Sequence, residues 1–143
     1  MCAILDTNTF GKFKNPADED MKPVWKWLDS KDGKIAYANT KKFEDEWESG
    51  GMSHLRDQMM RAGQLKLVSE GVQEKADELK GEIVSNDEHI IALAIIAGVK
   101  ILVSYREGDR DLFTDFKNRG LVGGRVYTRK THARHLLRKD TCP

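Results

Sequence analysis

The chain of 143 residues lacks the features that mark membrane proteins, zinc proteins and highly basic nucleic-acid binders. No apolar run reaches the roughly 18 residues that a membrane-spanning helix needs. The two cysteines, Cys2 and Cys142, have no metal-ligand spacing, which argues against a zinc site. Their separation does not exclude a disulfide, but reduced thiols in a cytoplasmic protein are favoured. The net charge of +1 argues against a protein that is polybasic over its whole surface.

Repeats, linkers and low-complexity segments are also lacking, and the first residues have no basic segment of the kind that opens a secretory signal. The hydrophobic fraction of 39% and the charged fraction of 33% are those of an ordinary globular protein. The length is enough for one domain with a real hydrophobic core. We therefore expect a single domain over residues 1–143, with no membrane association and a cytoplasmic location.

Short β-like apolar runs alternate with longer helical patterns along the chain. The runs that predict strands cover residues 2–5, 35–38, 65–68, 99–104 and 125–128. The helical patterns cover residues 16–30 (where Pro23 could kink or divide the helix), 41–49 after a Thr40 cap, 52–61, 72–79, 85–97, 112–118 and 131–138. This alternation predicts an α/β fold in three layers, with a central, mainly parallel sheet flanked by helices.

Acidic residues follow two of the predicted strands and open one of the helices. Asp6 directly follows the first strand, Asp109 and Asp111 follow the fourth, and Asp87 stands at the head of the most apolar helix. Open α/β sheets bind their ligands at the carboxyl ends of the strands. The sequence therefore predicts that these carboxylates lie at one edge of the sheet.

Each acidic residue also has a purely structural explanation. Asp6 and Asn8 can form a turn or a helix cap. Asp87 can complement the helix dipole, an effect of about 0.3–1 kcal/mol. Asp111 can cap the helix that opens at Leu112. The acids at positions 44–46 can simply form a solvated helix face.

Taken together, the acids indicate a metal site. Carboxylates within a few ångströms repel one another, so they take up protons or destabilise the fold unless a cation lies among them. A ligand set made of oxygen alone selects a hard ion, Mg²⁺ or Mn²⁺. Because such ions also bind phosphate oxygens, the pattern points to phosphodiester or phosphoryl chemistry.

Three segments, in this order, resemble the PIN-domain nucleases, a family that includes the toxin ribonucleases of many toxin–antitoxin pairs. The first is Ile-Leu-Asp-Thr-Asn at 4–8, and the second is the Asp-led apolar helix that starts at Asp87 and ends at Gly98. The third is the strand at 101–103 with Ser104, followed by Asp-Arg-Asp-Leu at 109–112. Four residues separate Ser104 from Asp109, where the family has about one, so Asp109, Asp111 and Glu107 stay open as the ligand, with Asp109 preferred.

The resemblance implies a Mg²⁺- or Mn²⁺-dependent endoribonuclease in which a metal-activated water attacks the phosphodiester bond. The implied catalytic and metal-binding residues are Asp6, Glu46, Asp87 and Asp109, with Asp111 as a further metal ligand. Glu46 is preferred over Glu44 because it lies six positions after Thr40 and directly before an apolar residue. Asn8 and Ser104 would orient these carboxylates through hydrogen bonds.

The remaining expectations concern RNA and protein partners. Arg125, Arg129, Lys130 and Arg134 form a basic stretch that could contact an RNA backbone; the alternative is a solvated helix. His89 is expected in the core or at the surface rather than as a general base. The tryptophans suit a core or an oligomer interface, which leaves a homodimer open. An inhibitory protein partner would restrain the nuclease activity.

Two other functions compete with the nuclease. A haloacid-dehalogenase-type phosphatase would need a second aspartate two residues after Asp6, where this chain has Asn8. A non-catalytic PIN-fold module for protein binding is the other alternative, motivated by the extra residues at 105–108 and by the uncertain second acid. The joint presence of Asp6, Asp87 and Asp109 argues against it, because a lapsed site has no reason to keep mutually repelling acids.

Overall fold

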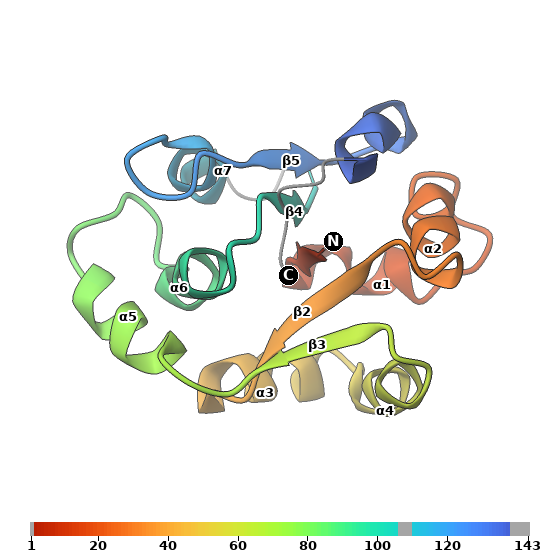
Figure 1. Ribbon diagram of the computed structural model, residues 1–143, viewed down its shortest axis with the longest axis horizontal. Helices are drawn as coiled ribbons and strands as arrows, with labels where there is room; N and C mark the ends of the chain where they lie inside the picture. The colour runs from red at the N-terminus through yellow and green to blue at the C-terminus, as the bar shows by residue number, and fades with distance from the viewer. Residues whose placement is uncertain (1, 106–109, 138–143) are drawn as a thin grey trace.

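A five-stranded, wholly parallel sheet forms the centre of the protein in the computed structural model, which describes residues 2–105 and 110–137 (Figure 1). The strands are β1 (Cys2–Leu5), β2 (Lys34–Ala38), β3 (Leu65–Val68), β4 (Ile101–Val103) and β5 (Arg125–Tyr127). Their order across the sheet is β3-β2-β1-β4-β5. All five predicted strands are therefore present, and the predicted three-layer α/β fold is confirmed.

Helices cover both faces of this sheet. They are η1 (Thr7–Thr9), α1 (Phe10–Phe13), α2 (Lys22–Asp29), α3 (Lys41–Ser49), α4 (Ser53–Arg61), α5 (Val72–Leu79), α6 (Glu88–Ala97), α7 (Arg110–Lys117) and η2 (Lys130–Leu137). Figure 1 shows α5, α6 and α7 on one side of the sheet and α1 and α2 on the other. The chain moves across the sheet in one direction from β1 to β3 and in the opposite direction from β3 through β4 to β5. Because such parallel connections are right-handed, the helices of the two halves lie on opposite faces.

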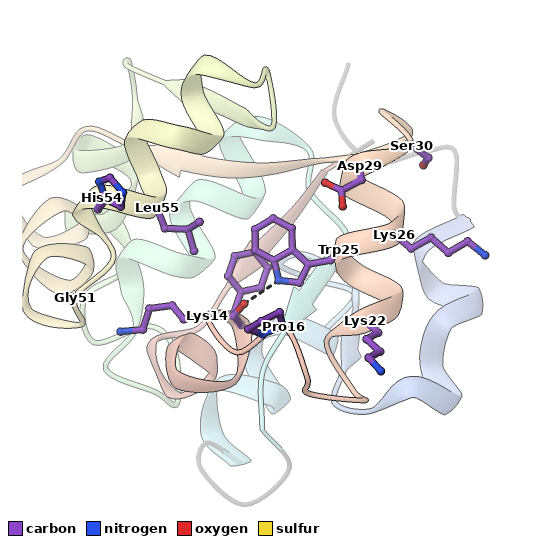
Figure 2. A pocket seen from close by; sticks show the side chains of 11 residues that line it. Lys14, Pro16, Lys22, Trp25, Lys26, Asp29, Ser30, Gly51, His54 and Leu55 are labelled. Carbon is purple, nitrogen blue, oxygen red and sulfur yellow. Dashed lines mark hydrogen bonds between the residues drawn. The ribbon is translucent and has the colours of Figure 1, made fainter.

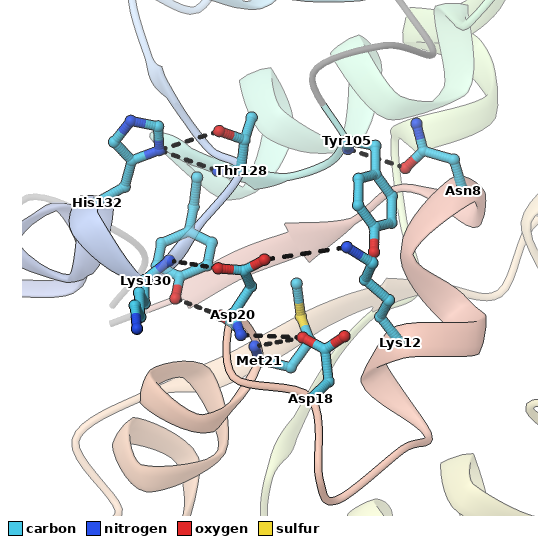
Figure 3. Close-up of polar contacts among 10 residues, drawn as sticks. Asn8, Lys12, Asp18, Asp20, Met21, Tyr105, Thr128, Lys130 and His132 are labelled. Atoms are coloured by element: carbon cyan, nitrogen blue, oxygen red, sulfur yellow. Dashed lines mark hydrogen bonds and ion pairs between the residues drawn. The ribbon is translucent and has the colours of Figure 1, made fainter.

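The first part of the chain differs most from the prediction. The helix predicted over residues 16–30 begins only at Lys22, with Pro23 in its first turn. Proline has no amide hydrogen to donate, and the first turn of a helix is the place that tolerates it. The preceding residues form turns, in which the Asp18 carboxylate accepts the N–H groups of Asp20 and Met21 at 2.9 and 3.1 Å (Figure 3). The short helices η1 and α1 were not predicted.

Local sequence signals account for the helix ends nearest the site. The Thr40 hydroxyl accepts the Phe43 N–H at 3.4 Å and caps α3, as predicted. Gly98, with φ of 69°, ends α6 in a left-handed conformation that favours glycine. The predicted C-terminal helix is present as the 3₁₀ helix η2.

The core lies between the sheet and its helices. All four residues of β1 are buried, as expected for a central strand covered on both faces. Cys2 is disulfide-bonded, so the prediction of reduced thiols is wrong; Cys142, the other cysteine of the chain, lies outside the described residues. Trp27 and Trp47 are buried in the core. Within the part of the chain that the structure describes, no helix has both the length and the apolar character to cross a membrane.

The strand order creates a switch point between β1 and β4. The chain leaves β1 towards β2 on one side, whereas β4 is added later on the other. Ile4 pairs with Leu102 and Leu5 with Val103, so the strands end at the same level. A crevice at the carboxyl ends of such strands is the usual ligand site of open α/β sheets.

Candidate active site

Asp6 and Ser104 occupy the switch point, one residue beyond the paired ends of β1 and β4. The Asp6 N–H donates to the Val103 carbonyl at 2.9 Å, which extends the pairing of the two strands by one residue. The Ser104 hydroxyl donates to Asp6 Oδ2 at 2.7 Å. Both side chains are almost fully buried, with 2% and 1% of their residues' surface exposed. The carboxylate therefore has a fixed orientation at the edge of the sheet.

Asn8 lies beside this pair with its amide in a defined orientation. Its Oδ1 atom accepts the Tyr105 N–H at 3.2 Å and lies 3.2 Å from Ser104 Oγ (Figure 3). The amide nitrogen Nδ2 is buried and has no hydrogen-bond partner among the described residues. Because Oδ1 already accepts the backbone N–H, Asn8 presents a hydrogen-bond donor next to Asp6 rather than a metal ligand. Asn8 contacts Ser104, but among the described residues its amide nitrogen makes no hydrogen bond to a carboxylate, so its predicted orienting role stays a prediction.

Glu46 and His89 form a second polar pair near this edge. Glu46 comes from α3 and His89 from the first turn of α6, and His89 Nε2 lies 2.7 Å from Glu46 Oε2. The histidine is buried, whereas 30% of the Glu46 side chain is exposed. Glu44 is exposed on the same helix, whereas Glu46 is hydrogen-bonded to α6 through His89. His89 was expected either in the core or at the surface, and the structure places it in the core; its contact with Glu46 was not predicted.

Asp87 immediately precedes α6 and is partly exposed. Its carboxylate makes no capping hydrogen bond to the helix, but its place at the N-terminus of α6 is compatible with the predicted alternative, in which it complements the helix dipole. Its own N–H donates to the Ser85 hydroxyl at 3.3 Å. The segment at 84–87, which leads into α6, is therefore held by a hydrogen bond of its own.

Asp115, in α7, fixes that segment and was missed in the sequence. Its two carboxylate oxygens accept the N–H groups of Val84 and Ser85 at 3.0 and 2.8 Å, and only 2% of the residue is exposed. Asp115 lies three residues after Leu112 and one before Phe116, both of which are buried. A carboxylate on the apolar face of a helix is the signal that could have revealed it.

Of the two acids predicted at the end of β4, the structure describes Asp111 alone. Asp109 lies outside the described residues, and Asp111 is exposed in the first turn of α7. Within residues 2–105 and 110–137, no three histidine, cysteine or carboxylate side chains form a metal-binding group. Asp6, Glu46 and Asp87 carry the oxygen donors that Mg²⁺ and Mn²⁺ prefer, but the structure does not bring these three described residues together as a metal-binding group.

The four predicted RNA-contact residues are exposed, and they divide between two surfaces. Arg125 and Arg129 line a polar groove of about 710 Å³ beside β5. Lys130 lies near α2, where its N–H donates to the Asp20 carboxylate at 3.0 Å (Figure 3). Arg134 lies in η2 and is not among the residues that line the groove.

A separate cavity of about 930 Å³ lies between α2 and the start of α4 (Figure 2). Trp25, Leu55 and Pro16 give it an apolar wall, and Lys14 and Lys26 stand at its sides. Trp25 is held by a hydrogen bond from its indole N–H to the Phe13 carbonyl at 2.8 Å. None of the predicted carboxylates lines this cavity, so it is distinct from the candidate active site.

Comparisons of the chain with protein-family models, with curated proteins and with solved structures find no match in any of the three. A functional assignment therefore depends on the residues and geometry described above.

Proposed function

We propose that this protein is a Mg²⁺- or Mn²⁺-dependent ribonuclease of the PIN-domain type. The observation that carries the proposal is the buried carboxylate of Asp6 at the β1–β4 switch point, held by the Ser104 hydroxyl at 2.7 Å. Carboxylate oxygens at the carboxyl ends of parallel strands suit a hard cation and the phosphate oxygens that such a cation binds.

Asp6 and Asp87 are the residues that would hold the ion, with Glu46 as a further carboxylate and Asp109 as the fourth residue of the set. A divalent cation supplies positive charge for the phosphate oxygens and lowers the pKa of a water molecule. Ser104 holds Asp6, and His89 holds Glu46, each by one hydrogen bond. The buried amide nitrogen of Asn8, which has no hydrogen-bond partner among the described residues, would be a further donor at this site.

RNA is proposed over DNA because of the resemblance to the toxin ribonucleases. The same resemblance supports a role as the toxin of a toxin–antitoxin pair, with an inhibitory protein as its partner. A cytoplasmic location belongs to this proposal, although disulfides such as that of Cys2 are rare in the cytoplasm.

The test is cleavage of a panel of single-stranded and structured RNAs with Mn²⁺, Mg²⁺ or EDTA. Wild type is compared with Asp6→Asn and Asp87→Asn, and with Asp45→Asn as a control, because Asp45 is exposed and pairs with Lys41 at 2.9 Å. We expect metal-dependent cleavage that the first two variants lose and the control retains. Cleavage that survives both substitutions would point to a contaminant or to a different site.

A non-catalytic protein-binding module is the second candidate. Glu46 already contacts His89, and the described residues form no group of three metal ligands. Titration of the protein with Mn²⁺ separates the two functions, since the module needs no ion. Absence of both Mn²⁺ binding and cleavage would favour the module.

A further inference from the structure

A strongly basic groove runs along the outer edge of β5. It is lined by positively charged residues and a histidine from α7, the following loop, β5 and the start of η2: Arg110, Lys117, Arg119, Arg125, Arg129 and His132. No carboxylate is among the described residues that line it. Figure 1 shows α7 and η2 on either side of β5. We call this surface the β5 groove.

Tertiary structure concentrates the charge of the β5 groove. Arg125 and Arg129 belong to the basic stretch seen in the sequence, whereas Arg110, Lys117 and Arg119 come from the preceding helix and loop. Five like charges around one groove of about 710 Å³ repel one another. An anion bound among them would relieve this repulsion, and guanidinium groups suit phosphate oxygens in particular.

His132 reports this electrostatic environment. Burial lowers its pKa from the ordinary value, and the nearby charges of Arg129, Arg134 and Lys117 lower it further. Its Nδ1 accepts the Thr128 N–H at 3.1 Å, which fixes the ring at the wall of the groove. Burial and these positive charges thus lower the pKa of this side chain together.

The β5 groove is lined by residues of β5 and by the two glycines that precede this strand. Among the described residues β5 pairs with β4 alone and is an edge strand, and Gly123 and Gly124 precede it without side chains. A Cβ atom at Gly124 would lie 2.4 Å from the Phe116 ring and 2.8 Å from the Lys100 carbonyl, so the chain passes tightly against α7. The groove follows β5 from Arg125 to Arg129, which lies just beyond the strand's carboxyl end and so towards the sheet edge that holds Asp6.

Flat rings on the groove favour a nucleic acid over an acidic protein. Phe113 lines it, with Lys117 Nζ 6.0 Å from the ring centroid. The His132 and His135 rings stack at 5.2 Å between centroids and 12° between planes. Nucleobases stack on such faces, and basic grooves with aromatic surfaces bind single strands with little sequence preference. The carboxylates of an acidic peptide do not stack on these rings.

We infer that the β5 groove binds the phosphate backbone of single-stranded RNA and leads the strand towards the carboxyl edge of the sheet. The inference rests on the proposed ribonuclease function for the identity of the polymer. The proposed RNA-binding surface differs from the four-residue basic stretch predicted from the sequence. In it, Arg110, Lys117 and Arg119 act together with Arg125 and Arg129.

The experiment is fluorescence anisotropy with a short labelled oligouridylate in EDTA, where metal-dependent cleavage is blocked. Wild type is compared with Lys117→Gln, Arg125→Gln and the double variant, and with Lys34→Gln as a control at the exposed start of β2. We expect each groove variant to weaken binding about tenfold at low salt and to reduce the salt dependence, because one phosphate contact is lost. The control should bind as wild type does. Both groove side chains are exposed, so thermal unfolding should be unchanged.

Groove variants that bind RNA as tightly as wild type overturn the inference, and so does a wild-type protein that binds no oligouridylate. Polyglutamate binding that matches oligouridylate at the same salt concentration also overturns it, in favour of an acidic protein partner. The proposed function is judged separately by cleavage. Asp6→Asn should lose cleavage and keep RNA binding, whereas the groove variants should weaken RNA binding.

Discussion

Ser104 donates its hydroxyl hydrogen to the buried carboxylate of Asp6 over 2.7 Å, although 98 positions separate the two residues in the chain. The contact exists because β1 and β4 are neighbours in the sheet and end at the same level. The hydrogen bond joins Asp6, a predicted metal ligand, to Ser104, the residue that directly follows β4. Several measurable consequences follow from this and from related contacts.

Loss of the Ser104 hydroxyl should destabilise the protein. Ser104→Ala leaves one oxygen of a buried charged group without this donor, and hydrogen bonds to charged groups contribute about 1.5–3 kcal/mol. Urea unfolding monitored by circular dichroism measures the change. Ser53→Ala, at the start of α4 and far from Asp6 in the fold, is the control. Equal stability of Ser104→Ala and wild type would contradict the proposed role of the hydroxyl.

Asp115 should matter far more for stability than Asp111, although both are acids on α7. Asp115→Asn places an amide NH₂ against two backbone N–H donors, so we expect a loss of about 1–3 kcal/mol in the free energy of unfolding. Asp111→Asn changes an exposed side chain and should stay within about 0.5 kcal/mol. The same urea assay compares them. Similar values for the two variants would show that the segment at 84–87 does not depend on Asp115.

The contact between His89 and Glu46 predicts which glutamate of α3 is functional. His89→Gln should lower Mn²⁺ affinity or cleavage by about 10–100-fold, because His89 orients Glu46. Glu46→Gln should have at least a comparable effect. Glu44→Gln, on the exposed face of the same helix, should leave both quantities unchanged. Calorimetric titration with Mn²⁺ and the RNA cleavage assay provide the measurements, and sensitivity to Glu44→Gln instead would reverse the assignment.

Acid should destabilise the protein partly through His132. Its pKa is lowered in the folded protein, so the unfolded chain, with a histidine pKa of about 6.5, binds the proton first as the pH falls. The free energy of unfolding should therefore fall as the pH drops through about 6.5 towards the lowered pKa. Urea unfolding at neutral and acidic pH should show a smaller acid-induced loss for His132→Gln than for wild type. An identical loss would contradict the lowered pKa.

Gly124 should tolerate no side chain. Gly124→Ala would force a Cβ atom against the Phe116 ring and the Lys100 carbonyl, and overpacking of this kind costs about 1–3 kcal/mol. Gly11→Ala is the matched control, because nothing lies within 4 Å of its Cβ position and helical alanine is favoured over glycine by about 0.5–1 kcal/mol. Thermal unfolding should thus shift in opposite directions for the two variants. The prediction fails if Gly124→Ala unfolds at the wild-type temperature.

Much of the fold follows from local patterns in the sequence. Runs of apolar residues that are buried on both faces mark strands such as Cys2–Leu5, and the Thr40 cap and Gly98 mark helix ends. These signals are local because they depend on side-chain periodicity and on backbone conformations that few residues adopt. The start of α2 was placed wrongly, because Pro16 and Pro23 each suit a first turn and periodicity does not choose between them.

The candidate site was only partly accessible from the sequence. Asp6 was predicted from its place at the end of a strand, whereas Ser104 was predicted as an orienting residue only through the resemblance to PIN-domain nucleases. The contact of His89 with Glu46 and that of Asp115 with the segment at 84–87 were not predicted. Both His89 and Asp115 lie in helices, where a polar residue usually faces solvent. Their roles depend on which helices cross near the edge of the sheet.

The sequence by itself determined the α/β alternation, the positions of the strands and the presence of acids at strand and helix ends, because these depend on neighbours within a few residues. Only the tertiary structure decided that β1 lies beside β4, that Asp6 is held by Ser104, and that Arg110, Lys117 and Arg119 join Arg125 and Arg129 in one groove. Strand order and helix packing bring together residues that are distant in the chain. Their electrostatic and hydrogen-bond energies depend on separations in space, which local sequence patterns do not contain.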